Sequence, residues 1–412
     1  MTEITISDVS LHYGPIVALR GVTLRVEAGE FLVLVGASGS GKTSVLRAVA
    51  GLEQPVAGDI ILGSRSVFSA THQIDVPPAK RGVGMVFQSH ALYPHMTVGQ
   101  NVGFPLRTRR WPKPRQAPAV AAALETVDLA GFEERLPREL SGGQRQRVAL
   151  ARALISEPSV LLFDEPLSSV DAKLRVSLRA DLKRLHRRTG ATTLYVTHDI
   201  AEAMALGDRI AVIAEGTVHQ VGSPEQVYAA PETLAVAALF GARGSSLVPG
   251  VVTDVAGGGQ AVRLEGDSRR QLPLPANRST YAEQAVVVDL RAQDVVVADA
   301  AGFGAAASRG VDSGAVSSFP ATVMARHPHG ERDWATVVAD GSGREIVARG
   351  AAERQLAIGE RVWVSAAASN VYDAGTERLL VSSSAHQAGL AAQEPAAPAA
   401  APGRSALAGA RS

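Results

Sequence analysis

The stretch Gly36-Ala37-Ser38-Gly39-Ser40-Gly41-Lys42-Thr43 decides the fold that the sequence predicts. It follows the apolar run 31–35, which is short and glycine-bounded, as a buried parallel strand is. Residues 44–52 after it carry apolar side chains at helical spacing. A strand, a glycine loop and a helix in this order are the context that a phosphate-binding loop requires.

This loop predicts a site for a nucleoside triphosphate. Glycines let backbone N–H groups turn toward an anion, and the helix N-terminus adds the positive end of its dipole. Lys42 is expected to reach the β- and γ-phosphates, and the Thr43 hydroxyl to bind Mg²⁺. The alternative is a glycine-rich turn with a surface lysine, but every fixed position of the motif is filled.

Length and composition bound the class of protein. With 412 residues, 46% of them hydrophobic, the chain is expected to form two or three domains with real cores. A net charge of +1 gives no sign of a nucleic-acid partner, and the lack of cysteine excludes disulfides and thiolate metal sites. We see neither a signal peptide nor an apolar run near bilayer length, so we expect a soluble, cytoplasmic chain.

Strands and helices alternate over residues 1–240, and polar residues gather where strands end. This predicts an α/β sheet with its ligand site at the carboxyl ends of the strands. Residues 93–157 are expected to form a helical subdomain, with the region before residue 131 interrupted by prolines at 105, 112, 114 and 118.

Two acids follow the apolar run 160–163. Asp164 is expected to hold Mg²⁺ and its water shell, and Glu165 to polarise a water for attack on the γ-phosphate. Gln88 and His198 also end strand-like runs and can hydrogen-bond to that phosphate. Taken singly, Glu165 could be a helix-capping carboxylate and His198 a loop histidine.

A second anion site is predicted at the start of a strongly periodic helix. Ser141 and Gln144 have the spacing of a capping box, which fixes where this helix begins. Its first N–H groups have no partner within the helix, so they can bind an anion.

With these motifs in this order, residues 1–240 resemble the nucleotide-binding subunit of an ABC importer. The matching motifs are the Walker A loop 36–43, a Q-loop Phe87-Gln88, the ABC signature 140–147, Walker B 161–165, a D-loop 168–171 and a switch histidine 196–199. The signature is the most specific of these, because P-loop enzymes at large lack it.

The resemblance implies ATP and Mg²⁺ as cofactors and a head-to-tail homodimer. In that dimer Ser141 and Gly143 would close over the ATP bound by the partner's Lys42. Tyr13 would stack on adenine, and catalysis would fall to Glu165, His198 and Gln88. The residues assigned to the nucleotide are Tyr13, the whole loop 36–43, Ser44, Ser141, Gly143, Gln144 and Asp171, and those assigned to the metal are Thr43, Gln88 and Asp164.

After residue 240 the pattern changes to short β runs separated by turn residues. We predict two small all-β modules, 245–298 and 319–383, joined by a linker 299–318 and followed by a disordered tail 384–412. They resemble the OB-like TOBE modules of importer ATPases. His327 and His329 lack a third ligand nearby in the sequence, so we expect them to be solvated.

The predicted function is that of the ATP-hydrolysing subunit of an importer at the cytoplasmic face of the cell membrane. It implies integral membrane permease subunits that dock near the Q-loop and residues 93–103, and indirectly an extracytoplasmic solute-binding protein. By resemblance of residues 75–98 we predict ferric iron or a polyamine as cargo, with sulfate, phosphonate and sugar left open. Two alternatives remain: a soluble ABC ATPase of DNA repair or translation, and C-terminal modules that serve mainly regulation.

Overall fold

The computed structural model describes most of the chain. The described ranges are 2–168, 170–241, 245–255, 259–265, 271–274, 282–292, 295–298, 318–329, 332–339, 343–349, 356–366 and 370–382. The predicted tail, residues 299–317 of the predicted linker and Ser169 of the D-loop lie outside these ranges.

A six-stranded sheet with the order β11-β10-β3-β9-β8-β7 forms the centre of the N-terminal part. Its strands are β3 (Phe31–Val35), β7 (Val83–Val86), β8 (Val160–Asp164), β9 (Thr192–Thr197), β10 (Arg209–Ala214) and β11 (Thr217–Gly222). All neighbours are parallel except β10 and β11. Every residue of β3, β8 and β9 is buried, as parallel strands covered on both faces are. The predicted α/β sheet is confirmed.

A second, antiparallel sheet with the order β2-β1-β4-β5-β6 covers one side of the first helix, α1 (Lys42–Ala50). Its strands are β1 (Ile4–Tyr13), β2 (Ile16–Val26), β4 (Ala57–Leu62), β5 (Arg65–Ser69) and β6 (Ile74–Asp75). One apolar cluster joins Ile6 of this sheet, Leu46 of α1 and Leu34 of the central sheet. The helix that begins at the phosphate loop is therefore fixed between two sheets.

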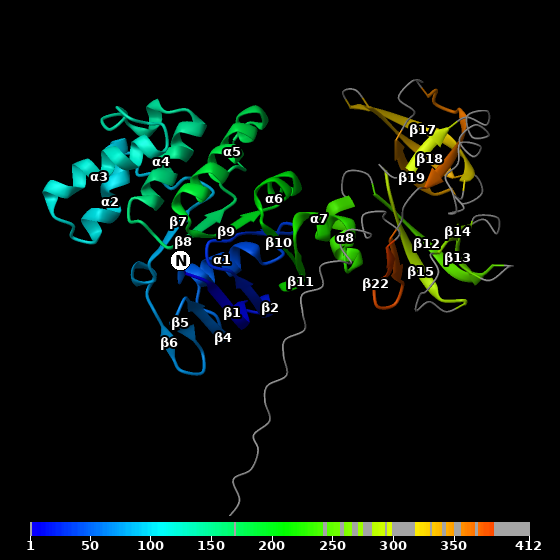
Figure 1. Ribbon diagram of the computed structural model, residues 1–412, viewed down its shortest axis with the longest axis horizontal. Helices are drawn as coiled ribbons and strands as arrows, with labels where there is room; N and C mark the ends of the chain where they lie inside the picture. Colours follow the sequence, from blue (N-terminus) through cyan, green and yellow to red (C-terminus); the bar gives the residue numbers. More distant parts are fainter. Residues whose placement is uncertain are drawn as a thin grey trace, which may run out of the picture.

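Helices cover the other face of the central sheet (Figure 1). They are α2 (Val98–Thr108), α3 (Lys113–Thr126), α4 (Gly142–Leu154), α5 (Ala172–Thr189) and α6 (Ile200–Leu206). Short 3₁₀ turns precede β7, at Pro78–Lys80, and α4, at Pro137–Glu139. Four prolines are expected to interrupt the helical region, but only Pro112 lies between two helices, where it is the N-cap residue of α3. Pro114 lies in the first turn, where its missing N–H costs no helical bond, while Pro105 and Pro118 are accommodated inside α2 and α3.

Two short helices lead to the C-terminal strands, α7 (Pro224–Ala229) and α8 (Leu234–Gly241). A six-stranded sheet follows in the order β14-β13-β12-β15-β21-β22, built from β12 (Ser245–Asp254), β13 (Gln260–Leu264), β14 (Gln271–Pro273), β15 (Ala285–Arg291), β21 (Asn370–Asp373) and β22 (Leu379–Ser382). A closed barrel contains β16 (Val295–Ala298), β17 (Ser318–His329), β18 (Arg332–Ala339), β19 (Glu345–Arg349) and β20 (Arg361–Ala366).

The strand pairing corrects the predicted division into modules 245–298 and 319–383. Strand β16 pairs with β20 in the barrel, whereas β21 leaves the barrel and pairs with β15. One apolar cluster contains residues of both sheets. Short β runs in a sequence indicate that strands are present, but they do not show which strands pair across 70 or more residues, as β15 and β21 do. The predicted division followed the order of the strands along the chain and therefore missed this pairing.

The last strands also contact the segment between α7 and α8. The Tyr372 hydroxyl donates a hydrogen bond to the Pro231 carbonyl at 3.2 Å, and the Leu379 N–H donates to the Glu232 carbonyl at 2.9 Å. The Leu234 N–H donates in turn to the Glu377 carbonyl at 3.0 Å. These bonds hold the C-terminal sheet against the end of the N-terminal part.

Tyr372→Phe tests this junction. Tyr372 is fully buried, so the substitution leaves the Pro231 carbonyl without its donor, and we expect a loss of about 1–2 kcal/mol in the free energy of unfolding. Urea denaturation measures this loss. Tyr93→Phe is the control, because Tyr93 is 36% exposed and should leave the midpoint unchanged. Equal midpoints for the two variants would contradict the role given to the Tyr372 hydroxyl.

Candidate nucleotide-binding and hydrolysis site

The phosphate loop connects β3 to α1 and needs glycine at two positions. A Cβ at Gly36 would lie 2.1 Å from the Ile213 carbonyl oxygen, closer than any real contact. Gly41 has φ +104°, a left-handed conformation, and a Cβ there would lie 2.8 Å from the Ala18 carbonyl oxygen. The loop therefore passes so close to neighbouring backbone that a side chain would displace it.

Lys42 lies folded over the loop with its charge largely removed from solvent. Its Nζ donates hydrogen bonds to the Gly36 carbonyl at 2.9 Å, the Ala37 carbonyl at 2.7 Å and, at 3.4 Å, to the Ser40 hydroxyl. Burial lowers the pKa of Lys42, although Glu165 and Asp164 act in the opposite direction. All three acceptors are neutral, so a phosphate oxygen would be a stronger partner, and the loop fits the predicted triphosphate.

Thr43 and Asp164 join the loop to the end of β8. The Thr43 hydroxyl donates to Asp164 Oδ1 at 2.9 Å, and an Arg47 Nη lies 4.0 Å from Asp164 Oδ2. Burial raises the pKa of Asp164, against the effects of Thr43 and Arg47, and the nearby Glu165 raises it further. A hydroxyl and one carboxylate are the oxygen ligands with which proteins hold Mg²⁺ beside a phosphate, so the pair fits the predicted metal.

Glu165 has a strained backbone at the carboxyl end of β8. Its φ is +43°, an uncommon conformation for a residue other than glycine. Its N–H donates to the Val196 carbonyl at 3.0 Å, and its carbonyl accepts from the Ser168 hydroxyl at 2.9 Å. Strain of this kind persists only where the surroundings hold it, and it is concentrated at functional sites.

The Glu165 carboxylate is where three predicted residues meet. Its Oε2 lies 3.1 Å from His198 Nδ1 and accepts a hydrogen bond from Gln88 Nε2 at 3.5 Å. These residues follow three different strands, β7, β8 and β9, whose carboxyl ends lie side by side. The structure thus brings Gln88, Glu165 and His198 together beside the Thr43–Asp164 pair.

Tyr13 lies at the end of β1, close to the start of α1. Its hydroxyl is 3.4 Å from the Ser44 hydroxyl, and the residue is 41% exposed. The ring therefore offers an open aromatic surface next to the phosphate loop. Its stacking on adenine stays a prediction.

The signature residues form a second cluster at the start of α4. The Ser141 hydroxyl accepts from the Gln144 N–H at 3.3 Å and Gln144 Oε1 accepts from the Ser141 N–H at 2.9 Å, which is the capping box that the sequence predicts. Asp171 caps α5 through the Leu174 N–H at 2.9 Å. Within the described ranges, no hydrogen bond or ion pair joins Ser141, Gly143 or Asp171 to the phosphate loop.

Sequence reasoning did not identify Arg175. Its guanidinium donates to the Val170 carbonyl at 3.0 Å and to Asp199 Oδ2 at 3.2 Å, and Asp199 caps α6 through the Ala201 N–H at 2.8 Å. Arg175 therefore connects the D-loop to the residue after His198. The only signal in the sequence was the capping position of Asp199.

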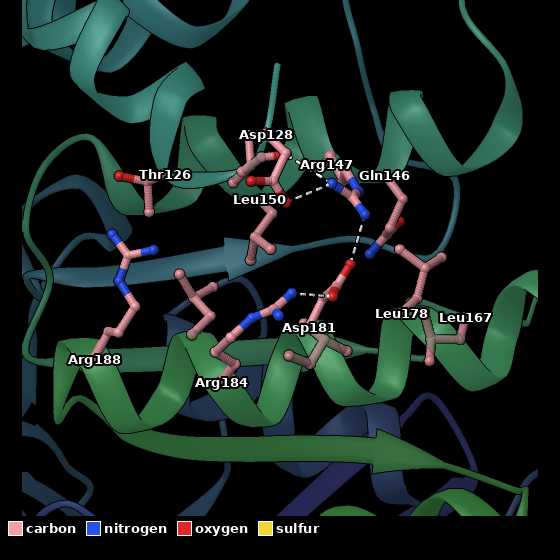
Figure 2. Close-up of a pocket in the computed structure, with 13 residues that line it drawn as sticks. Thr126, Asp128, Gln146, Arg147, Leu150, Leu167, Leu178, Asp181, Arg184 and Arg188 are labelled. Atoms are coloured by element: carbon pink, nitrogen blue, oxygen red, sulfur yellow. Dashed lines mark hydrogen bonds and ion pairs between the residues drawn. The ribbon is translucent and has the colours of Figure 1, made fainter. Parts of the chain in front are cut away.

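A separate pocket of about 130 Å³ lies between α4 and α5 (Figure 2). Arg147 of α4 pairs there with Asp128 at 2.9 Å and with Asp181 of α5 at 2.6 Å. Gln146 also lines the pocket, is 2% exposed, and has no hydrogen-bond partner for either amide atom among the residues described. These contacts connect α4 and Asp128 to α5 and do not include the phosphate loop.

A metal site requires several ligating side chains at one point, a condition that also applies to the two histidines at 327 and 329. Nowhere in the described ranges do three or more His, Cys, Asp or Glu side chains converge on one point. His327 Nε2 lies 3.0 Å from the Thr336 hydroxyl, and the side chain of His329 falls outside what is described.

Comparison with known proteins identifies the class. The ABC transporter family profile matches residues 19–168. The chain is 49% identical over 254 residues, which is 62% of this chain and 68% of the relative, to a trehalose/maltose import ATP-binding protein of Thermococcus litoralis. It is 45% identical over 273 residues, 66% of this chain and 73% of the relative, to an sn-glycerol-3-phosphate import ATP-binding protein of Ralstonia nicotianae. It is 44% identical over 292 residues, which is 71% of this chain and 79% of the relative, to a lactose transport ATP-binding protein of Rhizobium radiobacter.

The chain therefore belongs to the ABC transporter family. It is an ATPase of this family, and it uses ATP with Mg²⁺. The resemblance to the importer-type members that the motifs indicated is confirmed.

Gly36→Ala and Gly39→Ala separate steric crowding from backbone strain in the loop. A Cβ at Gly36 meets the Ile213 carbonyl, whereas a Cβ at Gly39, with φ +80°, meets nothing within 4 Å. We expect Gly36→Ala to weaken ATP binding by more than about 100-fold, and Gly39→Ala by only about tenfold, because strain at one left-handed residue costs about 1–2 kcal/mol. Fluorescent-nucleotide titration measures both, and equal losses would rule out the steric explanation.

Asp164→Asn tests the burial of the Asp164 charge. The folded-state pKa is raised above the ordinary value, so the ionised carboxylate opposes folding at neutral pH, and this penalty disappears as pH falls through the raised pKa. We expect the variant to have a higher unfolding midpoint than the wild type at pH 7 without nucleotide, which calorimetry measures. We also expect Mg²⁺ no longer to affect its affinity for ATP, which nucleotide titration with and without Mg²⁺ measures. A lower midpoint would contradict the raised pKa.

Proposed function

We propose that this chain is the ATP-hydrolysing subunit of a solute importer. The observation that carries the proposal is the shared contact of Gln88 and His198 with one oxygen of Glu165, beside the Thr43–Asp164 pair. This arrangement holds a carboxylate, rather than a freely rotating side chain, at the edge where the γ-phosphate would lie. It supports hydrolysis over simple nucleotide binding.

The residues of this chain divide the proposed reaction among them. The loop N–H groups and Lys42 bind and orient the β- and γ-phosphates, after Lys42 exchanges its carbonyl partners for phosphate oxygens. Thr43, Asp164 and Gln88 would hold Mg²⁺, which would supply positive charge to offset that of the phosphates. Glu165 orients a water and accepts its proton, and His198 holds the carboxylate and contacts the γ-phosphate.

A homodimer would complete the site. The chain contains one phosphate loop and one signature segment, and these two do not contact each other in the described structure. In two copies arranged head to tail, Ser141 and Gly143 of one copy would cover the ATP bound to the other. Gln144, Asp171 and Tyr13 would complete the nucleotide contacts. ATP binding would close the pair and hydrolysis would reopen it.

Membrane subunits are a further part of the proposal. None of the helices in the described ranges has the length and apolar character needed to cross a bilayer. Permease subunits would supply the pathway and dock near Gln88 and residues 93–103, which places the chain peripherally at the cytoplasmic face of the membrane. An extracytoplasmic solute-binding protein would act through those subunits.

The relatives change the cargo that the sequence suggested. The three relatives above are named for trehalose or maltose, lactose, and sn-glycerol 3-phosphate. We therefore propose a carbohydrate or glycerol-phosphate cargo, and the expected ferric iron or polyamine cargo is withdrawn. Their names also favour import over DNA repair or translation. The C-terminal strands are proposed to be TOBE-like modules, and a regulatory ligand there remains a second role in addition to transport.

Glu165→Gln tests both the base and the dimer. Removing the charge should reduce the rate of ATP hydrolysis at least about 1000-fold, because the amide cannot accept a proton. In size-exclusion chromatography, ATP should shift the variant to a stable dimer. Glu157→Gln is a matched control, since Glu157 is also a non-glycine residue with positive φ, at +47°, and is exposed.

Persistent hydrolysis in Glu165→Gln at a rate near wild type would remove Glu165 from the role of base and overturn the mechanism. Loss of hydrolysis without a dimer would keep the base and indicate that closure requires the permease subunits.

A further inference from the structure

Charge is distributed very unevenly along this chain. Between Asp75 and Glu125 there is no acidic residue, while the same segment contains 7 Lys and Arg residues. Because the whole chain has a net charge of +1, the remainder carries a net charge of −6. Most of the excess lies in residues 107–115, which we call the basic loop, and its cations are Arg107, Arg109, Arg110, Lys113 and Arg115.

The basic loop joins α2 to α3 on the helical subdomain, at the opposite end of the structure from the C-terminal strands (Figure 1). All five of its cations are exposed, and none of them forms an ion pair with any residue in the described ranges. Trp111 lies in the middle of these cations and is itself 37% exposed. An indole and five cations without an ion pair in the described ranges therefore share one exposed loop, although Arg107 donates a hydrogen bond to the Gln100 carbonyl at 2.5 Å.

The conformation of the basic loop is fixed by the chain itself. The Trp111 N–H donates to the Leu106 carbonyl and the Arg110 N–H to the Arg107 carbonyl, both at 3.0 Å. The Trp111 carbonyl accepts from Gln116 Nε2 at 2.9 Å, and Pro112 begins α3 immediately afterwards. A surface that is already ordered has little conformational entropy to lose when it binds.

A mainly apolar groove of about 470 Å³ lies next to the loop. Trp111 lines this groove together with apolar residues of α3 and α4, among them Ala119, Ala123 and Leu154. Its polar lining residues are Thr126, Glu157 and Thr189. The surface therefore combines cations, an interfacial aromatic residue and an apolar recess. These are the features that let a peripheral protein bind charged headgroups and reach the upper acyl region.

We propose that the basic loop binds the surface of an anionic lipid bilayer. The five cations attract anionic headgroups, and Trp111 enters the headgroup region, where tryptophan is preferred. The proposal rests on the proposed function, which brings the chain to the membrane through permease subunits. Those subunits are expected near Tyr93, and α2, with 11 residues and a length of about 16 Å, separates Tyr93 from the basic loop. The loop would then contact lipid beside the permease.

A nucleic acid is the other polyanion to consider. Single-stranded nucleic acids bind where several aromatic side chains stack on successive bases along a basic groove. Trp111 is the only aromatic residue of the basic loop, and none of the other residues that line the recess beside it is aromatic. The observations therefore favour a lipid surface.

Flotation of the full-length protein with vesicles tests the proposal. The comparison is between vesicles of phosphatidylcholine alone and vesicles in which one third of the lipid is phosphatidylglycerol. We expect binding to the anionic vesicles, weakened by high salt, and a shift of tryptophan emission to shorter wavelength. The chain has 3 tryptophans, so Trp111→Phe should remove that shift if Trp111 is the one that enters the headgroups.

Two matched pairs of arginines provide the variants. Arg109→Gln with Arg110→Gln should lower vesicle partitioning about 25-fold, since each cation near an anionic surface contributes about fivefold. Arg187→Gln with Arg188→Gln changes the same charge at two adjacent, exposed arginines of α5 and should leave partitioning nearly unchanged. Both variants should keep the ATPase rate in solution, which shows that they are folded.

Equal binding to neutral and anionic vesicles, equal losses from the two arginine pairs, or an unchanged emission maximum would each overturn the proposal. Displacement of the vesicles by a single-stranded oligonucleotide at equal phosphate concentration would also overturn it, since the loop would then be a general polyanion site. No permease is present in these vesicles, so a negative result leaves the Glu165 experiment, and with it the proposed function, undisturbed.

Discussion

The hydrogen bond from the Thr43 hydroxyl to Asp164 connects the two parts of the chain on which the site depends. Thr43 belongs to the helix that is fixed between the two sheets, and Asp164 is the last residue of the buried strand β8. Once these two residues are joined, the positions of their neighbours follow. Lys42 precedes one and Glu165 follows the other, so the buried cation and the strained carboxylate are placed on either side of the same point.

Several contacts extend this arrangement away from the phosphate loop. His198 reaches Glu165 from the end of β9, and the next residue, Asp199, is held by Arg175 of α5. The same α5 pairs through Asp181 with Arg147, which lies in the signature helix α4. A displacement of α4 relative to the central sheet would therefore change contacts of α5, the helix that holds Asp199 beside His198. The buried amide of Gln146, which has no hydrogen-bond partner among the described residues, lies at the same junction.

The sequence was most informative where a function depends on local backbone. The strand at 31–35 and the loop after it were predicted correctly because glycine spacing and apolar runs are local properties, although α1 begins at Lys42, two residues before the predicted start. The capping box at Ser141 was found for the same reason. Contacts between distant residues could not be read from the sequence. Arg175 has an unremarkable place on a helix rich in arginine and lysine, and its role depends on the approach of β9, which only the fold brings about.

The return of β21 and β22 to the sheet of β12 and β15 has a consequence for how the protein is made on the ribosome. The N-terminal part can fold as soon as it has emerged, because all strands of its two sheets lie before residue 223. Strand β15, in contrast, keeps an open edge until residues 370–382 have been synthesised, some 80 residues later. An open strand edge is a template for pairing with other chains. Incomplete chains that end inside the barrel therefore combine a folded ATPase part with an exposed edge, and they are the form of this protein most prone to aggregate during translation.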